Sequence, residues 1–206
     1  MVTHPDALCA VGILAQFMQN LGMVHWNALM HVITYLNTTK YCWPTFGQGA
    51  NQLEGYSDVD WALQTHRHSI SGYVFHMGDG AVTWSSKKQV VVALSSTKAK
   101  YTVQTHAVKE LIWLHTILSE LNSPFEEPIT LNCNNQGAIA HVKDNKFHAR
   151  TKHINICYHH ICEAIKNSNI NMQYIAMNEN IANIFTKPLA KVKFEHFTEK
   201  LGLGYA

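Results

Sequence analysis

The order of the elements predicted for residues 55–185 constrains the fold of this chain more than any other feature of its sequence. Alternating side chains predict strands at Gly55–Trp61, Ser71–His76 and Ala81–Ser85. Between the second and third strands, the sequence has the Asp-Gly chemistry of a tight turn. Three strands joined by such short links form an antiparallel meander.

Helices alternate with strands after this meander. The longest periodic helix follows a candidate N-cap at Ser95–Thr97 and ends before Pro124. Its apolar face comprises Ala99, Val103, Ala107, Leu111, Leu114, Leu118 and Leu121. The elements expected after it are a buried strand over Ile129–Cys133, a short helix with Ala138, Ile139 and Val142, a helix over His153–Lys166, a strand over Ile170–Ile175 and a helical segment over Glu179–Phe185. This order predicts an α/β fold with a five-stranded mixed sheet and helices on both faces.

The N-terminal region has the helical period instead. Apolar stripes predict one helix over Pro5–Gln19 and a second with Trp26, Leu29, Met30, Ile33 and Leu36, which together form a helical hairpin. Around Tyr41–Gln52 the composition shifts to Pro, Gly, Gln and Asn, which is typical of a boundary. We therefore expect a helical hairpin over residues 1–45, a main domain over 50–190, and a C-terminal helix and tail over 191–206.

Length and composition exclude several classes of protein. The 206 residues suit one domain, or one domain with a small helical appendage, and no run of 18 apolar residues predicts a membrane span. The N-terminus lacks a signal-peptide pattern, and the five scattered cysteines are typical of reduced thiols. We expect an intracellular protein, either cytoplasmic or nuclear. The net charge of +2 is too small to argue nucleic-acid binding by itself.

The first predicted strand carries the residues of greatest chemical interest. Its alternation places Tyr56, Asp58 and Asp60 on one face. Carboxylates held close together on a central strand need cations between them, which favours a metal-binding strand. An edge strand with a solvated face explains the same pattern. The stretch alone does not decide between the two.

Seven motifs follow one another along the chain: Gly55–Ala62, Ser71–Phe75, Trp84–Gln89, Ala93–Thr97, Cys133–Ala140, Arg150–Ile154 and Thr186–Leu189. In this order they resemble the ribonuclease H domain at the C-terminal end of Ty1/copia retrotransposon Pol polyproteins. The first 45 residues are similar to the tail of the preceding reverse transcriptase region, with His25-Trp26 and Tyr35-Leu36 matching its two helices. The resemblance implies a ribonuclease H-like fold within a fragment of a larger polyprotein. It also implies that the apolar faces of the two N-terminal helices would pack on the missing reverse transcriptase region.

The chemistry that this resemblance implies is two-metal hydrolysis of the RNA strand of an RNA–DNA hybrid. Four carboxylates of the family hold two Mg²⁺ ions about 3.5–4 Å apart. Asp58 matches the first of these positions. The other three carry Lys98 in Ser-Thr-Lys-Ala-Lys-Tyr, Asn134 in Cys-Asn-Asn-Gln, and Asn183 in Ala-Asn-Ile-Phe-Thr-Lys, where the family has Glu, Asp and Asp.

These substitutions change the electrostatics of the expected site. A lysine ammonium about 5 Å from Mg²⁺ repels it by roughly 1–2 kcal/mol at water-like screening, and by several kcal/mol at an effective dielectric near 20. We therefore expect no cofactor to bind well, an ion pair between Lys98 and Asp58, and absent or feeble ribonuclease H activity. The alternatives are a weakly active nuclease and a non-catalytic module that binds RNA–DNA hybrid.

Residual nucleic-acid binding is a separate expectation. Lys87, Lys88, Arg150 and Lys152 are expected in loops beside the active face, where they could contact the phosphates of a hybrid or of another nucleic acid weakly. Ordinary solvated lysines explain the same residues. A membrane partner is not expected.

Histidine and cysteine usage admits two further interpretations. The chain has 14 histidines and only Arg67 and Arg150 as arginines. A mutational bias from G to A and C to T would explain scarce arginine, surplus histidine and lost carboxylates together, which describes a decayed element with a degenerate site. A zinc site at His153, Cys157, His160 and Cys162 is the rival for that segment, but Cys162 does not share the helix face of the other three.

Overall fold

A five-stranded mixed sheet forms the centre of the computed structural model, which describes residues 3–46, 52–60, 68–90, 96–121, 128–136, 139 and 170–205. The strands are β2 (Leu53–Asp60), β3 (Ile70–Met77), β4 (Gly80–Lys88), β5 (Ile129–Cys133) and β6 (Ile170–Tyr174), in the spatial order β4-β3-β2-β5-β6. The meander β2-β3-β4 is antiparallel, whereas β5 runs parallel to both β2 and β6. The predicted mixed sheet is confirmed. The edge-strand interpretation of Gly55–Trp61 is wrong, because β2 lies at the centre.

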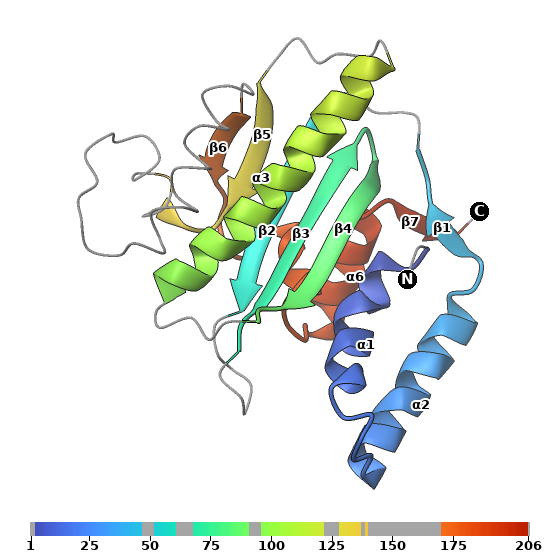
Figure 1. Cartoon of the computed structure of the whole chain (residues 1–206). Coiled ribbons are helices and arrows are strands. Elements are labelled where there is room, and N and C mark those ends of the chain that lie inside the picture. The colour runs from blue at the N-terminus through green and yellow to red at the C-terminus, as the bar shows by residue number, and fades with distance from the viewer. Residues whose placement is uncertain are drawn as a thin grey trace.

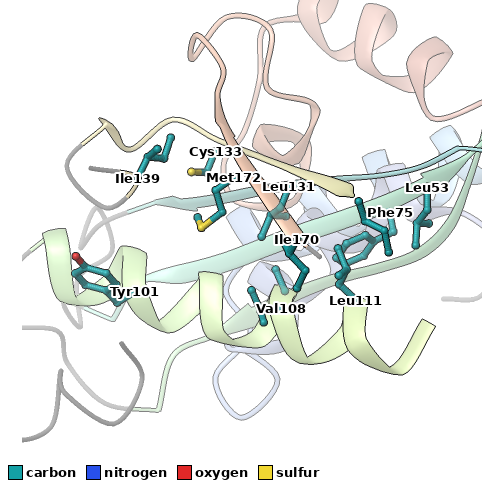
Figure 2. Close-up of a cluster of buried hydrophobic side chains, with 12 residues drawn as sticks. Leu53, Phe75, Tyr101, Val108, Leu111, Leu131, Cys133, Ile139, Ile170 and Met172 are labelled. Carbon is teal, nitrogen blue, oxygen red and sulfur yellow. The ribbon is translucent and has the colours of Figure 1, made fainter. Parts of the chain in front are cut away.

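Helices cover both faces of this sheet (Figure 1). On one face lies α3 (Ser96–Glu120), whose residues Val108 and Leu111 pack with Phe75 and Leu131 of the sheet (Figure 2). On the opposite face, the 3-10 helix η2 (Ile181–Phe185) and α6 (Lys191–Lys200) bury a second cluster. That cluster comprises Val74, Ala81, Ile181, Ile184, Phe185, Phe197, Leu201 and Leu203.

The helical segment predicted over Glu179–Phe185 is the five-residue 3-10 helix η2 and not an α-helix. Asn180 caps η2, since its side-chain oxygen accepts a hydrogen bond from the Ala182 backbone N–H at 3.0 Å. Its amide nitrogen donates to the Ser57 carbonyl oxygen at 2.9 Å. Asn180 thereby fixes the start of η2 against the central strand.

The predicted N-terminal helices are present as α1 (Leu8–Ala15) and α2 (Met23–Thr38), preceded by the 3-10 helix η1 (Pro5–Ala7). The short helix α1 packs against β4 and η2, so the hairpin is joined to the sheet. A strand over Cys42–Pro44, β1, pairs antiparallel with β7 (Leu203–Tyr205). Neither three-residue strand was predicted, because both are too short to show a period. The proposed domain boundaries stay a prediction.

Several expected features lie outside the described residues. These are the helix over His153–Lys166, the zinc ligands proposed within it, Arg150, Lys152, Pro124, and Ala138 and Val142 of the short helix. Among the helices that the structure does describe, none is long and apolar enough to cross a membrane.

Candidate functional site

Asp58 is the buried centre of a polar network at the C-terminal end of β2. Its side chain is 1% exposed, and both carboxylate oxygens have partners. Oδ1 accepts a hydrogen bond from Asn134 Nδ2 at 2.9 Å, and Oδ2 accepts one from Thr186 Oγ1 at 2.6 Å. The ammonium nitrogen of Lys187 lies 3.5 Å from the same Oδ2. A buried charge in a protein is stabilised by this kind of pairing.

Strand register brings Asn134 to Asp58. In the parallel ladder between β2 and β5, Ser57 is opposite Cys133, so the residues that follow each of them lie side by side. Carboxyl ends of parallel strands meet at one edge of a sheet, which is where polar side chains from separate strands converge. The Asn134 amide presents its nitrogen to Asp58 because an ionised carboxylate only accepts hydrogen bonds.

A glycine on the neighbouring strand admits the segment that carries Thr186. Gly72 of β3 is opposite Asp58 in the antiparallel ladder. A Cβ atom at Gly72 would lie 2.7 Å from Phe185 Cβ and 2.8 Å from Thr186 Cγ2. Ser86 on β4 donates to the Phe185 carbonyl oxygen at 2.6 Å. The close approach of η2 to the sheet therefore depends on the absence of a side chain at residue 72.

Asn183 lies in η2 and is completely buried. Its Nδ2 donates to the Met177 carbonyl oxygen at 2.5 Å, while its Oδ1 has no hydrogen-bond partner. The Asn183 backbone oxygen accepts from the Thr186 backbone N–H at 3.2 Å. Asn183 therefore lies one turn before Thr186, which contacts Asp58 directly. The Asn183 amide nitrogen itself is bonded to Met177.

Lys98 lies in the first turn of α3, and its side chain is outside the described residues. Ala99, the next residue, is fully buried in a cluster with Val59, which follows Asp58 along β2. The backbone of this turn is thus near the end of β2. The ion pair between Lys98 and Asp58 stays a prediction, and the cation that the structure places on Asp58 is Lys187.

A second carboxylate, Asp60, lies close to the same network. Burial raises its pKa above the ordinary value, Lys187 opposes that rise, and Asp58 adds to it. Burial also raises the pKa of the Cys9 thiol to about 11, with the charge of Asp60 contributing. Among the described residues, no group of three or more His, Cys, Asp or Glu side chains could hold a metal ion.

Two of the lysines expected to bind phosphate, Lys87 and Lys88, lie on a strand and not in a loop. Lys87 and Lys88 are the last residues of β4, so they point to opposite faces of the sheet. Lys88 Nζ donates to Gln16 Oε1 of the segment after α1 at 2.7 Å. Lys87 is exposed on the α3 side, where burial lowers the pKa of His106 and the charges of Lys109 and Lys87 lower it further. The two neighbours therefore cannot contact one phosphate together.

Sequence analysis missed two residues of the network, Thr186 and Lys187. Both belong to the Thr-Lys-Pro-Leu stretch that contributed to the resemblance, so a signal was present without a role attached to it. Gly72 lies in another matching stretch, Ser71–Phe75. Its role could not be inferred from sequence because it depends on how closely a distant helix packs.

Comparison with known proteins finds long relatives in plants. The chain is 39% identical over 202 residues to the retrovirus-related Pol polyprotein from transposon TNT 1-94 of Nicotiana tabacum, a match that covers 98% of this chain and 15% of the relative. It is 36% identical over 203 residues to the corresponding polyprotein from transposon RE2 of Arabidopsis thaliana, covering 98% and 14%. The chain therefore spans only a small part of the relatives it matches. No protein-family model matches the sequence.

Comparison with solved structures identifies the fold. The crystal structure of LC11-RNase H1 in complex with RNA/DNA hybrid superposes with a TM-score of 0.52, covering 66% of this chain and 94% of that one. The sequences are 13% identical, so the likeness concerns the arrangement of strands and helices alone. That arrangement is the ribonuclease H fold.

Proposed function

Because the chain belongs to the Ty1/copia-type retrotransposon Pol polyproteins and has the ribonuclease H fold, we propose that it is a catalytically disabled ribonuclease H-like domain. By family, this site would hydrolyse the RNA strand of RNA–DNA hybrids with two Mg²⁺ ions. In this chain the buried network around Asp58 takes the place of the metals. The domain is then a pseudoenzyme, a degenerate relative of the active nuclease.

The observation that carries the proposal is the pairing of both oxygens of the Asp58 carboxylate with donors of the protein itself. Three donors from Asn134, Thr186 and Lys187 engage its two oxygens. A Mg²⁺ ion needs several oxygen ligands, and charged carboxylates are the ligands that it prefers. To bind Mg²⁺ here, the site would have to displace these donors and strip water from the ion. Only one retained family carboxylate would then coordinate it.

The presence of Lys187 does not by itself account for the proposed loss of metal binding. It lies in a motif shared with the family, so the departures are the neutral amides of Asn134 and Asn183 and the lysine at position 98. Four carboxylates would attract two dications strongly enough to displace an ammonium ion. A single carboxylate has no such advantage, since Lys187 already neutralises it at short range.

The described donors do not fit a two-metal centre. Asn183 Oδ1 is a buried oxygen without a partner, but it is neutral. Asn134 presents its amide nitrogen to Asp58 and not an oxygen. Asp60 is a spare carboxylate whose pKa is already raised by burial. We therefore derive no catalytic step through Mg²⁺ in this chain.

Restoration of the family carboxylates tests this proposal. Cleavage of a labelled RNA–DNA hybrid is measured with Mg²⁺ and with Mn²⁺, for the chain itself and for the variant Lys98→Glu, Asn134→Asp, Asn183→Asp. We expect cleavage only by the triple variant, and its loss when Asp58→Asn is added, because the cluster would then lack a central ligand. Rapid cleavage by the unmodified chain that disappears with Asp58→Asn would refute the proposal.

Weak, non-catalytic binding of hybrid is a second candidate function. It is favoured by the exposed Lys87, which lies close enough to Lys109 for both charges to act on His106. Contacts with phosphate need positive charge and donors but no metal. Fluorescence anisotropy with a labelled hybrid across a salt series is the test, with Lys87→Glu compared against Lys88→Glu. We expect the larger loss for Lys87, since Lys88 is held by Gln16.

A further inference from the structure

The segment that follows α6 closes onto the part of the chain that leads from α2 to the sheet. Residues 202–205 are called the clasp below, and residues 42–46 the connection. Three residues of each pair as the antiparallel strands β7 and β1, which lie side by side in Figure 1. The Gly202 carbonyl oxygen also accepts two hydrogen bonds from Thr45, at 2.9 Å from the backbone N–H and at 3.0 Å from the hydroxyl. The clasp therefore binds the connection along its whole length.

The junction beside the clasp has room for backbone atoms only. Gly202 has a φ of +76°, a left-handed conformation that favours glycine. A Cβ atom there would lie 2.5 Å from the Asp79 carbonyl oxygen and 2.9 Å from Gly80 Cα, in the turn between β3 and β4. The preceding residue, Leu201, is fully buried, and its carbonyl oxygen accepts a hydrogen bond from the Ala81 backbone N–H at 3.2 Å. Gly202 is thus the first residue after a fixed position, and it has the backbone freedom of a hinge.

Few buried contacts hold the clasp closed. The pair of β1 and β7 is a two-stranded sheet separate from the five-stranded one, and a pair of such short strands is marginally stable on its own. In the connection, Trp43 and Phe46 are 45% and 60% exposed. Leu203 adds one buried side chain to the cluster beneath α6, whereas the five-stranded sheet buries side chains on both faces. Opening of the clasp therefore exposes far less buried surface than unfolding of the sheet does.

Helix α2 has attachments of its own. The Tyr35 hydroxyl donates to the buried Asp6 carboxylate of η1, and its ring packs edge-on against Phe194 of α6 at 5.7 Å between centroids. Helix α1 packs against β4 and η2. These contacts do not involve the clasp, so its opening would free the connection and leave the hairpin in place.

We propose that the clasp opens about Gly202 as a unit of its own, and that the connection is fixed to the ribonuclease H fold only while the clasp is closed. The hairpin then has two attachments to the sheet, one through α1 and α2 themselves and one, which is reversible, through the clasp. This device sets how firmly the chain between hairpin and sheet is held. The inference goes beyond the proposed function and does not depend on whether the Asp58 site is active.

Native-state hydrogen exchange tests the proposal on the unmodified chain. Amide exchange is followed by NMR at urea concentrations below those that unfold the protein. We expect the Thr45 amide to exchange at least about tenfold faster than the amides of β3, since local opening costs less free energy than global unfolding. Its exchange should depend little on urea, because the urea dependence scales with the surface that the opening exposes.

The matched variants are Gly202→Ala and Gly204→Ala. A Cβ at residue 202 meets the turn between β3 and β4, whereas a Cβ at residue 204 meets no atom within 4 Å. We expect the Thr45 amide to exchange at least about tenfold faster in Gly202→Ala, since the contact and the left-handed φ both oppose closure. Its exchange should be unaltered in Gly204→Ala, and the β3 amides should be unaltered in both variants.

A milder pair of variants decides the matter if Gly202→Ala does not fold. Thr45→Val removes the hydroxyl that donates to the Gly202 carbonyl oxygen and keeps the amide. Thr39→Val is its control, because the Thr39 hydroxyl donates to the Tyr35 carbonyl oxygen instead. We expect exchange at residue 45 to be about threefold faster in Thr45→Val and unchanged in Thr39→Val.

Two outcomes would overturn the inference. One is a Thr45 amide that exchanges in the unmodified chain with the rate and urea dependence of the β3 amides, because the clasp would then open only when the sheet unfolds. The other is equal exchange at residue 45 within each matched pair that folds. Exchange is measured without hybrid or metal, so either result leaves the nuclease proposal untouched.

Discussion

The Asp58 network and helix α2 differ in whether their side chains have partners within the described structure. Around Asp58, both oxygens of a buried carboxylate have partners, which come from the segments that follow β5 and η2. On α2, large apolar side chains lie in water with no partner among the residues that the structure describes. The comparison teaches that a buried carboxylate in this fold is satisfied by donors from distant segments, whereas an apolar helix face without a neighbour among the described residues remains exposed.

The largest effect should come from removal of the buried acceptor. Asp58→Leu would remove the carboxylate that pairs with Asn134, Thr186 and Lys187 in a buried site, and we expect a loss of about 3–5 kcal/mol in the free energy of unfolding. Trp26→Leu on the exposed face of α2 should change the free energy of unfolding by less than about 0.5 kcal/mol. Urea unfolding measures both. Equal effects of the two substitutions would contradict the comparison.

Acidic pH should lower the free energy of unfolding through the protonation of His76 in β3. Burial lowers the pKa of this histidine to about 4, and its Nε2 has no hydrogen-bond partner. The unfolded imidazole, with a pKa near 6.5, binds its proton first, so stability falls as the pH drops from about 6.5 and the loss is complete below about 4. This loss in the free energy of unfolding amounts to about 3 kcal/mol.

The measurement is the pH dependence of urea unfolding for the chain and for His76→Gln. The difference between their unfolding free energies should shift by about 3 kcal/mol between pH 7 and pH 4, in the direction that favours the variant in acid. A difference that does not change with pH would show that His76 titrates alike in the folded and unfolded states.

A side chain at Gly72 should separate η2 from the sheet. Gly72→Ala places a methyl group 2.7 Å from Phe185 Cβ, and we expect a loss of about 1–3 kcal/mol in the free energy of unfolding. Gly204→Ala is the control, because a Cβ there meets no atom within 4 Å. Thermal unfolding of both variants is the measurement, and equal melting temperatures would contradict the role given to Gly72.

The smallest effect should come from Asp60. Its pKa is raised, so the folded state binds this proton more tightly than the unfolded state, and ionisation destabilises the fold as the pH rises through the raised pKa. Asp60→Asn should therefore stabilise the protein at pH 7 by a few tenths of a kcal/mol, given that the group is partly solvated. The gain should vanish below the ordinary pKa of aspartate, where the carboxyl is neutral in both states. A gain that persists at pH 3 would exclude this cause.

Sequence periodicity predicted the regular elements well where they are long enough to show it. The strand expected over Ile129–Cys133 is β5, and the helix expected after Ser95–Thr97 is α3. The pairing of β1 with β7 was missed, since three residues do not define a period. The helix predicted before Phe185 is a 3-10 turn, because its geometry is imposed by the Asn180 cap and the sheet beneath it.

The candidate site divides in the same way. Asp58, Lys98, Asn134 and Asn183 were predicted to occupy the family's carboxylate positions from motifs in separate segments, and this assignment stays a prediction. Lys187 could not be assigned to Asp58 in advance. It is 129 residues away along the chain (187 − 58), and the expected pairing of Lys98 with Asp58 stays a prediction because the Lys98 side chain is outside the described residues.

By itself, the sequence determined the order of strands and helices, the presence of Asp58 at the end of the first strand, and a helix region without fixed charge. Tertiary structure alone decided which of those groups meet. Parallel register set Asn134 beside Asp58, the bare backbone at Gly72 let η2 bring in Thr186 and Lys187, and the anchoring of Tyr35 left one stripe of α2 facing water. The physical reason is that periodicity reports local geometry, whereas the partner of a buried charge is chosen by packing between segments far apart in the chain.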